Sequence, residues 1–179
     1  MATLAPFQLE TPFLLRDGRS VQFGPISPAS RALIERAIAE LSPTTSYRRF
    51  FTVRHRLSDA ELDALTDLDG VDRYAIGASI REAGDTRGVG VARLVRDGER
   101  AHVADLALLV VDAFQGLGVG RALLTRLARA ALARGVDTFR GMVLVDNAPM
   151  LRLLRALAPD LRLSRVDDYY EVEVPITAA

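Results

Sequence analysis

The pattern of hydrophobic and polar positions switches along the chain between a helical and a strand period, which predicts a mixed α/β fold. Apolar residues three and four positions apart predict helices, and alternation or short apolar runs predict strands. Helices are expected over residues 27–41, 46–51, 58–68, 119–134 and 147–158. Strands are expected over residues 11–15, 20–23, 72–80, 88–95, 101–111, 138–145, 161–165 and 169–174.

Turn and breaker residues separate these segments and indicate how they connect. Asp17-Gly18 is typical of a tight hairpin, Pro43 is expected to stop the first helix, and residues 58–61 match a helix capping box. The wholly apolar run 106–111 predicts a strand that is buried on both faces. The order of elements favours an α/β sheet with antiparallel hairpins over a doubly wound parallel sheet.

Composition removes several functional classes. The chain has 179 residues, which fits one domain, and its 23 acidic residues balance 23 basic ones, so net charge does not predict a nucleic acid or an anionic membrane as partner. The absence of cysteine excludes disulfides, thiolate metal sites and a cysteine nucleophile. Because the chain has only two histidines, a dedicated transition-metal site is not expected.

Every one of the 23 basic residues is arginine, so the chain has no lysine. Codon bias in a GC-rich genome is the simplest interpretation. The chemical consequence is that the terminal amine is the only primary amine of the chain, so lysine-directed chemistry must act on another molecule. Residues 1–10 lack the pattern of a signal peptide and no apolar run reaches about 18 residues, so we expect a soluble, cytoplasmic protein.

A glycine-rich turn carries most of the candidate chemistry. An apolar strand ends at Val111, and Gly116, Gly118 and Gly120 then lead into a helix of good helix formers. Glycines let backbone N–H groups approach an anion closely, and a helix N-terminus adds about half a positive charge. The pattern predicts a phosphate or pyrophosphate site, and the alternative is a tight strand-to-helix turn without a ligand.

Spacing narrows the choice of phosphate ligand. A P-loop requires a lysine that this chain lacks, and the dinucleotide fingerprint requires a glycine where Arg121 stands. The segment fits the pattern Q-x-x-G-x-G, read as Gln115, Gly118 and Gly120. This pattern resembles the coenzyme A signature of the GNAT superfamily of N-acetyltransferases.

Further segments resemble one branch of that superfamily, the bacterial Pat-type protein lysine acetyltransferase domains. The similar segments are residues 41–43, 46–51, 57–62 and 147–154, and the resemblance covers most of residues 20–175. It implies a single N-acetyltransferase domain over residues 1–179 with its core at about 20–175. The implied fold is α/β, with a mixed, mostly antiparallel sheet of about six or seven strands flanked by about four helices.

The resemblance also implies a set of residues for the acyl donor, acetyl-CoA, and no metal. Loop amides would hold the pyrophosphate, and a backbone amide near residues 109–111 would polarise the thioester carbonyl. Asn147 would bind the pantetheine arm, cap a helix, or do both. The residues expected at the acetyl-CoA site are Leu109, Val110, Val111, Gln115, Gly116, Leu117, Gly118, Val119, Gly120, Arg121 and Asn147.

Asp105 is the candidate general base, because a lysine amine with a pKa of about 10.4 must lose a proton before it attacks. It interrupts an apolar strand, where desolvation would suit it to base catalysis. The alternative is an exposed carboxylate at the rim of the sheet, paired with His102 or an arginine. Pat-type domains commonly have Glu here, and the shorter Asp leaves room for a bridging water. The tyrosine that many GNAT enzymes use as general acid is absent, since Leu154 stands at its position.

Three functions remain open at this point. The first is transfer of an acetyl group from acetyl-CoA to a primary amine by direct attack on the thioester with base assistance, and the Pat-type resemblance favours a protein lysine as acceptor. The second is acetylation of a small-molecule amine, and the third is a catalytically weak acyl-CoA-binding regulatory module. None of the three predicts a nucleic acid, membrane or metal partner.

Overall fold

The computed structural model describes residues 13–177, so residues 11 and 12 of the expected first strand, and the segment that was compared with a signal peptide, lie outside the described residues. The strands are β1 (Phe13–Leu14), β2 (Ser20–Pro25), β3 (Arg73–Glu82), β4 (Asp85–Arg96), β5 (Val103–Val110), β6 (Thr138–Leu144), β7 (Arg162–Val166) and β8 (Tyr169–Pro175). The α-helices are α1 (Arg31–Ala39), α2 (Pro43–Phe50), α3 (Asp59–Thr66), α4 (Val119–Leu132) and α5 (Ala148–Leu157).

All these strands form one open sheet in the order β1-β2-β3-β4-β5-β6-β8-β7. Neighbouring strands are antiparallel except β5 and β6, which are parallel because α4 crosses between them and returns the chain in the same direction. The predicted mixed, mostly antiparallel α/β sheet is confirmed. Within residues 13–177 the fold has eight strands and five α-helices, slightly more than the expected six or seven strands and four helices.

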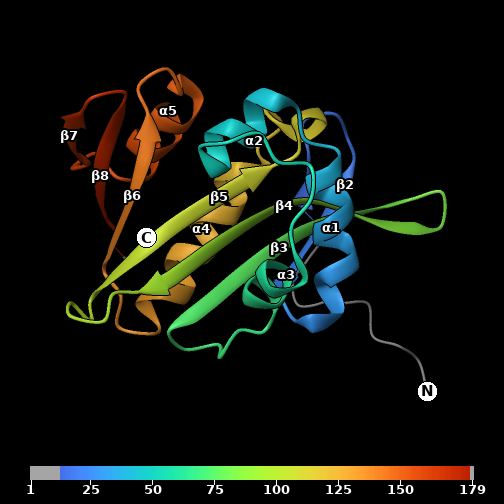
Figure 1. The fold of residues 1–179 in the computed structure, drawn as a ribbon, viewed down its shortest axis with the longest axis horizontal. Helices are drawn as coiled ribbons and strands as arrows, with labels where there is room; N and C mark the ends of the chain where they lie inside the picture. The colour runs from blue at the N-terminus through green and yellow to red at the C-terminus, as the bar shows by residue number, and fades with distance from the viewer. Residues whose placement is uncertain (1–12, 178–179) are drawn as a thin grey trace.

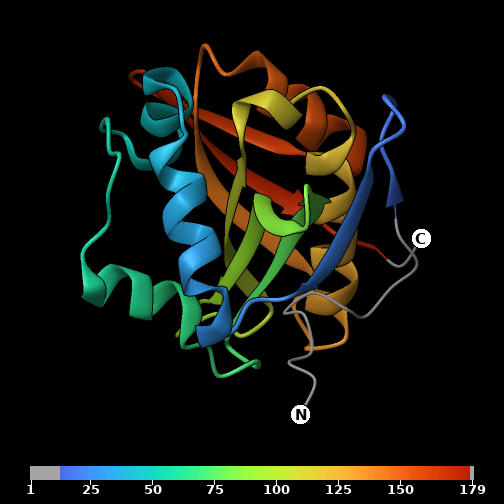
Figure 2. The same ribbon diagram turned by 90° about the vertical axis from the view of Figure 1, so that its right-hand side faces the viewer.

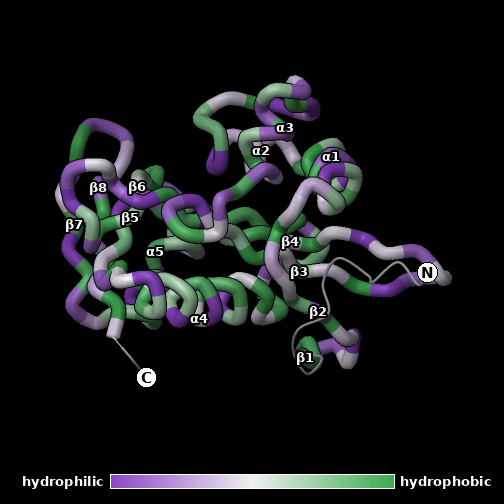
Figure 3. The backbone as a smooth tube through the Cα atoms, turned by 90° about the horizontal axis from the view of Figure 1, so that it is seen from below, coloured by the Kyte–Doolittle hydropathy of each residue, from purple (hydrophilic) through white to green (hydrophobic). Residues whose placement is uncertain are grey.

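Helices cover both faces of the sheet. Figures 1 and 2 show α1, α2 and α3 on one face and α4 on the other, and Figure 3 shows the sheet edge-on between these two layers. The apolar stripe of α4 explains its place, because Leu123, Leu127 and Ala131 are fully buried against the sheet and neighbouring core. The close packing of α4 against β4 requires glycine at position 90, because a Cβ atom there would lie 3.0 Å from the Leu123 side chain.

Local signals predicted the starts of α3, α4 and α5 to within one residue, but not those of α1 and α2. The first helix was expected from residue 27, but residues 28–30 form a 3-10 turn and α1 begins at Arg31. Pro43 was expected to stop the first helix, but α1 already ends at Ala39 and Pro43 is the first residue of α2. Proline is tolerated there because the first-turn N–H has no intrahelical acceptor. Ser42 caps this helix by accepting a hydrogen bond from the Thr45 N–H at 3.2 Å.

The capping box of α3 is confirmed. Ser58 Oγ accepts a hydrogen bond from the Glu61 N–H at 3.3 Å, and the Ser58 N–H donates to the Glu61 carboxylate at 2.8 Å. The hydrogen bond from Arg54, followed by those from Ser58, lowers the pKa of Glu61 to about 2. The carboxylate therefore stays ionised at neutral pH and holds the start of α3.

The feature of the fold that positions the site is a fork in the sheet. β5 and β6 pair only at Val103↔Thr138, Ala104↔Phe139 and Asp105↔Arg140, and then diverge (Figure 1). The expectation that the run 106–111 is buried on both faces is therefore wrong for much of it. Leu109 and Val111 are buried, but the other four residues of the run are only half-buried, because no strand lies beside them on the β6 side.

Candidate active site

A groove of about 1040 Å³ lies where β5 and β6 diverge. Its walls are the open side of β5, the facing part of β6, the end of α2, the start of α4 and the start of α5. Of the residues predicted from the sequence, those that line it are Asp105, Leu109, Val110, Gln115, Gly116, Gly118, Gly120, Arg121 and Asn147. The remaining three are Val111 and Val119, whose side chains lie in the core, and Leu117, which packs against the core.

Backbone N–H groups without acceptors line one end of the groove. Within residues 13–177, none of the six successive N–H groups from Gly116 to Arg121 donates a hydrogen bond, and the first helical bond of α4 runs from the Ala122 N–H to the Gly118 carbonyl at 3.0 Å. Gly116 and Gly118 have positive φ angles of 74° and 100°, which favour glycine. Because these N–H groups lie at a helix N-terminus, they fit an anion such as a pyrophosphate.

A hydrogen-bond network fixes the loop that precedes these N–H groups. Gln115 Nε2 donates to Val110 O and to Thr45 Oγ1, both at 3.0 Å, and Thr45 Oγ1 donates to Asp112 Oδ1 at 2.7 Å. Ser42 donates to the same carboxylate through its hydroxyl at 2.6 Å and its N–H at 3.0 Å. Burial alone would raise the pKa of Asp112, but the hydrogen bonds from Ser42 and Thr45 outweigh it and lower the pKa. The network therefore joins α2 to the loop with an ionised carboxylate at its centre.

The open side of β5 presents backbone N–H groups to the groove. The Val111 N–H bonds to the Val89 carbonyl on the β4 side, at 2.9 Å. Since hydrogen-bonding direction alternates along a strand, the backbone of Leu108 and Val110 is directed to the β6 side, where pairing has already ended. Of the three residues expected near the thioester carbonyl, only Val110 directs its N–H into the groove.

Asp105 lies at the fork, and its environment differs from the desolvated one that its apolar strand suggested. Its side chain is 53% exposed, and it pairs with Arg140 through Nε–Oδ1 at 2.5 Å and Nη2–Oδ2 at 3.4 Å. The alternative expectation, an exposed carboxylate paired with an arginine, is the one observed. Arg140 also contacts Asp97 at 2.6 Å. The hydrogen bond to Asp105, reinforced by the charge of Asp97, raises the pKa of Arg140.

The remaining predicted residues occupy positions that limit their roles. Asn147 lines the groove and also caps α5, since its Oδ1 accepts a hydrogen bond from the Met150 N–H at 3.3 Å, so both of its suggested roles are compatible with its position. Arg121 is exposed in the first turn of α4. Leu154, at the position of the general acid in many GNAT enzymes, is fully buried, and no tyrosine lines the groove within the described part of the chain.

Sequence reasoning missed two residues of the site. Arg140 was not singled out because it lies 35 residues from Asp105 along the chain, and only the register of a parallel pair brings them together. Thr45 was not singled out because it lies 70 residues from Gln115. The sequence did contain one signal for Arg140. The β5–α4–β6 crossover predicts that β6 lies beside β5, but it does not predict which residues of the two strands are paired.

No helix within residues 13–177 is long and apolar enough to cross a membrane. The same part of the chain contains no group of three or more histidine, aspartate or glutamate side chains placed to hold a metal ion.

Comparisons with known proteins agree with this geometry. Residues 35–158 match the family model described as "Acetyltransferase (GNAT) family". The chain is 32% identical over 157 residues to a protein named "Acetyltransferase Pat" from Mycolicibacterium smegmatis, covering 86% of this chain and 45% of the relative. It is 34% identical over 134 residues to an acetyltransferase of Pseudomonas aeruginosa, covering 75% of this chain and 70% of that protein. The chain thus spans less than half of the Pat relative.

Solved structures show the same fold. The GNAT domain of S. lividans PAT superposes with a TM-score of 0.82 at 29% identity, over 93% of this chain and 97% of that one. An acetyltransferase of Salmonella typhimurium described with its cofactor acetyl-CoA gives a TM-score of 0.68 at 17% identity, which supports the fold alone. The family match covers more than half of the chain, and the open groove beside β5 and the unpaired N–H groups at α4 agree with it. The chain belongs to the GNAT family of acetyltransferases.

Proposed function

We propose that this chain transfers an acetyl group from acetyl-CoA to a primary amine, and that the amine is a lysine side chain of another protein. The observation that carries the proposal is the row of six N–H groups without acceptors, Gly116 to Arg121, beside the open side of β5. An anion-binding loop and an adjacent strand edge suit the two polar parts of acetyl-CoA, its pyrophosphate and its pantetheine amides. Acetyl-CoA supplies the activated thioester, and the chain supplies positioning and proton transfer.

The roles of the chain follow from the geometry of the groove. The N–H groups from Gly116 to Arg121 hold the pyrophosphate, and Asn147 and the backbone of Leu108 face the pantetheine arm. The Val110 N–H stabilises negative charge on the thioester oxygen. Asp105 accepts the ammonium proton, directly or through a water, and Oδ2 is the available oxygen because its contact with Arg140 is the longer one. As the C–N bond forms and the C–S bond breaks, the amine nitrogen loses its second proton; since no tyrosine is assigned to protonate the leaving thiolate, this proton reaches the sulfur through water.

A protein acceptor is favoured by the rim of the groove as well as by the Pat-type relatives. Phe51 at the end of α2 and Met142 on β6 line the groove and are 39% and 55% exposed. Tyr47 and Val53 next to Phe51 are also exposed, at 47% and 49%. Exposed apolar side chains that gather around a site are typical of a surface that receives another macromolecule.

The first experiment is a calorimetric titration of acetyl-CoA into the wild-type chain and into Gly118→Glu, with ATP and NADH as control ligands. The glutamate places a negative charge among the anion-binding N–H groups, so we expect binding to weaken by about 100-fold or more. Gly84→Glu is the matched control, because Gly84 also has a positive φ, of 87°, in an open turn but lies in the β3–β4 hairpin. If the wild type does not bind acetyl-CoA, the proposal is wrong.

A second measurement separates the remaining functions. Because the chain contains no cysteine, a thiol reagent detects only released coenzyme A when the acceptor also lacks cysteine. Release that depends on a lysine-containing protein or peptide supports the proposed acceptor, and release that depends only on small amines supports the second function. Binding of acetyl-CoA with no release for any acceptor would favour an acyl-CoA-binding regulatory module.

A further inference from the structure

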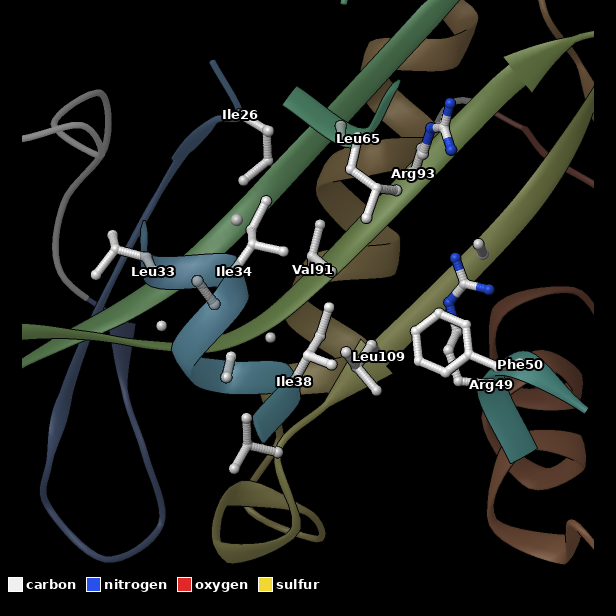
Figure 4. A pocket seen from close by; sticks show the side chains of 18 residues that line it. Ile26, Leu33, Ile34, Ile38, Arg49, Phe50, Leu65, Val91, Arg93 and Leu109 are labelled. Atoms are coloured by element: carbon white, nitrogen blue, oxygen red, sulfur yellow. The ribbon is translucent and has the colours of Figure 1, made fainter. Parts of the chain in front are cut away.

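A second, smaller pocket lies beneath α1, α2 and α3, on the face of the sheet opposite α4. Its free volume is about 50 Å³, which is room for a small group and not for a whole side chain. Most of its lining is apolar, from residues such as Ile34, Ile38 and Val91. Figure 4 shows that two arginines, Arg49 of α2 and Arg93 of β4, lie together at one end of this pocket.

Arg49 and Arg93 lack an anionic partner. Within residues 13–177 neither forms an ion pair with a carboxylate, and the buried Arg93 Nε has no hydrogen-bond acceptor. Arg93 donates to the Ala64 carbonyl at 3.2 Å, and Arg49 lies over the Phe50 ring at 4.9 Å. Burial, together with the charge of Arg93, lowers the pKa of Arg49, and burial, together with the charge of Arg73, lowers that of Arg93. Arginine stays charged despite such shifts, so the pocket holds two positive charges, and the part of the chain that the structure describes places no counter-ion beside them.

The pair of arginines is adjacent to the proposed catalytic groove. Arg49 lines both the small pocket and the groove. Arg93 is paired across the strands with Ala107, and Val95 is paired with Asp105. Since paired residues and those two apart share a face, Arg93 and Asp105 are diagonal neighbours on the same face, with about 7–8 Å between their backbones. A group held by the arginines therefore lies on the same face of the sheet as an amine at Asp105, and Arg49 connects the two positions.

We propose that Arg49 and Arg93 form an anion-binding subsite that pairs with a carboxylate of the acyl acceptor, close to the amine that is acetylated. The inference rests on the proposed function, because it specifies the acceptor of the same reaction. A carboxylate matches the planar fork of a guanidinium and fits the small volume of the pocket. In a protein acceptor it belongs to an aspartate or glutamate near the target lysine, and in a small-molecule acceptor it belongs to the same molecule as the amine.

The test compares matched acceptors that differ only in this charge. Coenzyme A release is measured with pairs of single-lysine peptides that have either Glu or Gln at one position, up to two residues before or after the lysine. A second pair consists of 6-aminohexanoate and its amide. We expect kcat/KM to be about tenfold higher for the charged member of at least one pair, mainly through KM. A preference in the peptide pairs assigns the carboxylate to a protein, and a preference in the other pair assigns it to a small molecule.

Variants decide whether the two arginines cause this preference. Arg49→Gln and Arg93→Gln should reduce it to less than about twofold. The control Arg56→Gln, which removes an equal charge from an exposed position near the end of α2, should keep it. Equal release with both members of every pair in the wild type would overturn the subsite while leaving acetyl transfer intact. A preference that survives in Arg49→Gln and Arg93→Gln would also overturn it.

A binding measurement covers the case in which no acceptor releases coenzyme A. Hexanoate and 1-hexanol are titrated into the chain, and the arginine Nε–H signals are followed by NMR. Hexanoate should shift signals that disappear in Arg49→Gln and Arg93→Gln, and 1-hexanol should not. If those signals do not respond to hexanoate, the subsite is wrong whatever the activity, and if they respond without any release, the proposed function is wrong and the subsite stands.

Discussion

The Asp105 carboxylate is the group on which proton transfer depends in the proposed reaction. We expect Asp105→Asn to lower kcat/KM by about 10²–10⁴-fold, because an amide cannot accept the ammonium proton. Asp105→Glu should retain more activity than Asp105→Asn, since it keeps the carboxylate. The measurement is acceptor-dependent coenzyme A release at saturating acetyl-CoA.

A matched control guards against a general effect of lost charge. Asp146→Asn removes an exposed carboxylate from the turn before α5 and should leave release unchanged. Acetyl-CoA affinity should be the same in both asparagine variants. If Asp105→Asn keeps wild-type kcat/KM, Asp105 is a surface carboxylate and another group removes the proton.

Single residues of the site were predictable to different degrees. Gly116, Gly118 and Gly120 were found from spacing alone, because close approach of a backbone to an anion demands a residue type that is visible in the sequence. The exposure of Asp105 was not predictable, because it depends on where β6 stops pairing, and the apolar neighbours along its own strand suggested the opposite.

At the scale of elements, α2 is linked to the loop after β5 by hydrogen bonds from Ser42 and Thr45, and the buried Thr45 hydroxyl is the group that reaches both Asp112 and Gln115. Thr45 is 8% exposed and connects Gln115 with Asp112. Thr45→Val keeps the shape but removes both hydrogen bonds, so we expect the free energy of unfolding to fall by about 1–2 kcal/mol. Urea denaturation followed by circular dichroism measures this, and the KM for acetyl-CoA should rise in the same variant because the loop loses its anchor.

The neighbouring residue provides the control. Thr44 is exposed on the same helix, so Thr44→Val makes the same chemical change without touching the network and should alter stability by less than about 0.5 kcal/mol. Equal stability of the two variants would show that the Thr45 hydroxyl does not hold the loop.

Elements whose signals are local were predicted best. The cap of α3, the glycine-rich start of α4 and the alternating strands were visible because each depends on residues within a few positions. The run 106–111 was misjudged because an apolar strand beside a ligand groove has the same composition as one buried on both faces. Only the neighbouring strand tells the two apart.

At the scale of the whole molecule, the sheet consists of two parts joined by a short ladder. Strands β1 to β5 form one part and β6, β8 and β7 the other, and three residue pairs connect them. The order of elements in the sequence predicted the fold class, because helix and strand periods and hairpin turns specify which strands are neighbours. The fork itself was not predictable from periodicity, since it depends on where β6 stops pairing with β5 and not on residue type.

The fork has a consequence for amide hydrogen exchange. Leu108 and Val110 lie in the middle of the sheet, yet no strand lies opposite their N–H groups to accept a hydrogen bond. The six N–H groups from Gly116 to Arg121 likewise have no acceptor. We expect all of these amides to exchange rapidly without a ligand, in contrast to Leu109 between them, and to slow by tenfold or more, about 1.4 kcal/mol, with saturating acetyl-CoA. Exchange read by NMR or by mass spectrometry of overlapping peptides measures this.

Slow exchange at these positions without a ligand would mean that the groove closes on itself in solution. In the expected case, amides at the centre of the sheet exchange as rapidly as those of its edge strands. Rapid solvent access there would mark a strand that is completed only by its substrate, so that the chain acquires the last ladder of its sheet each time it takes up a donor.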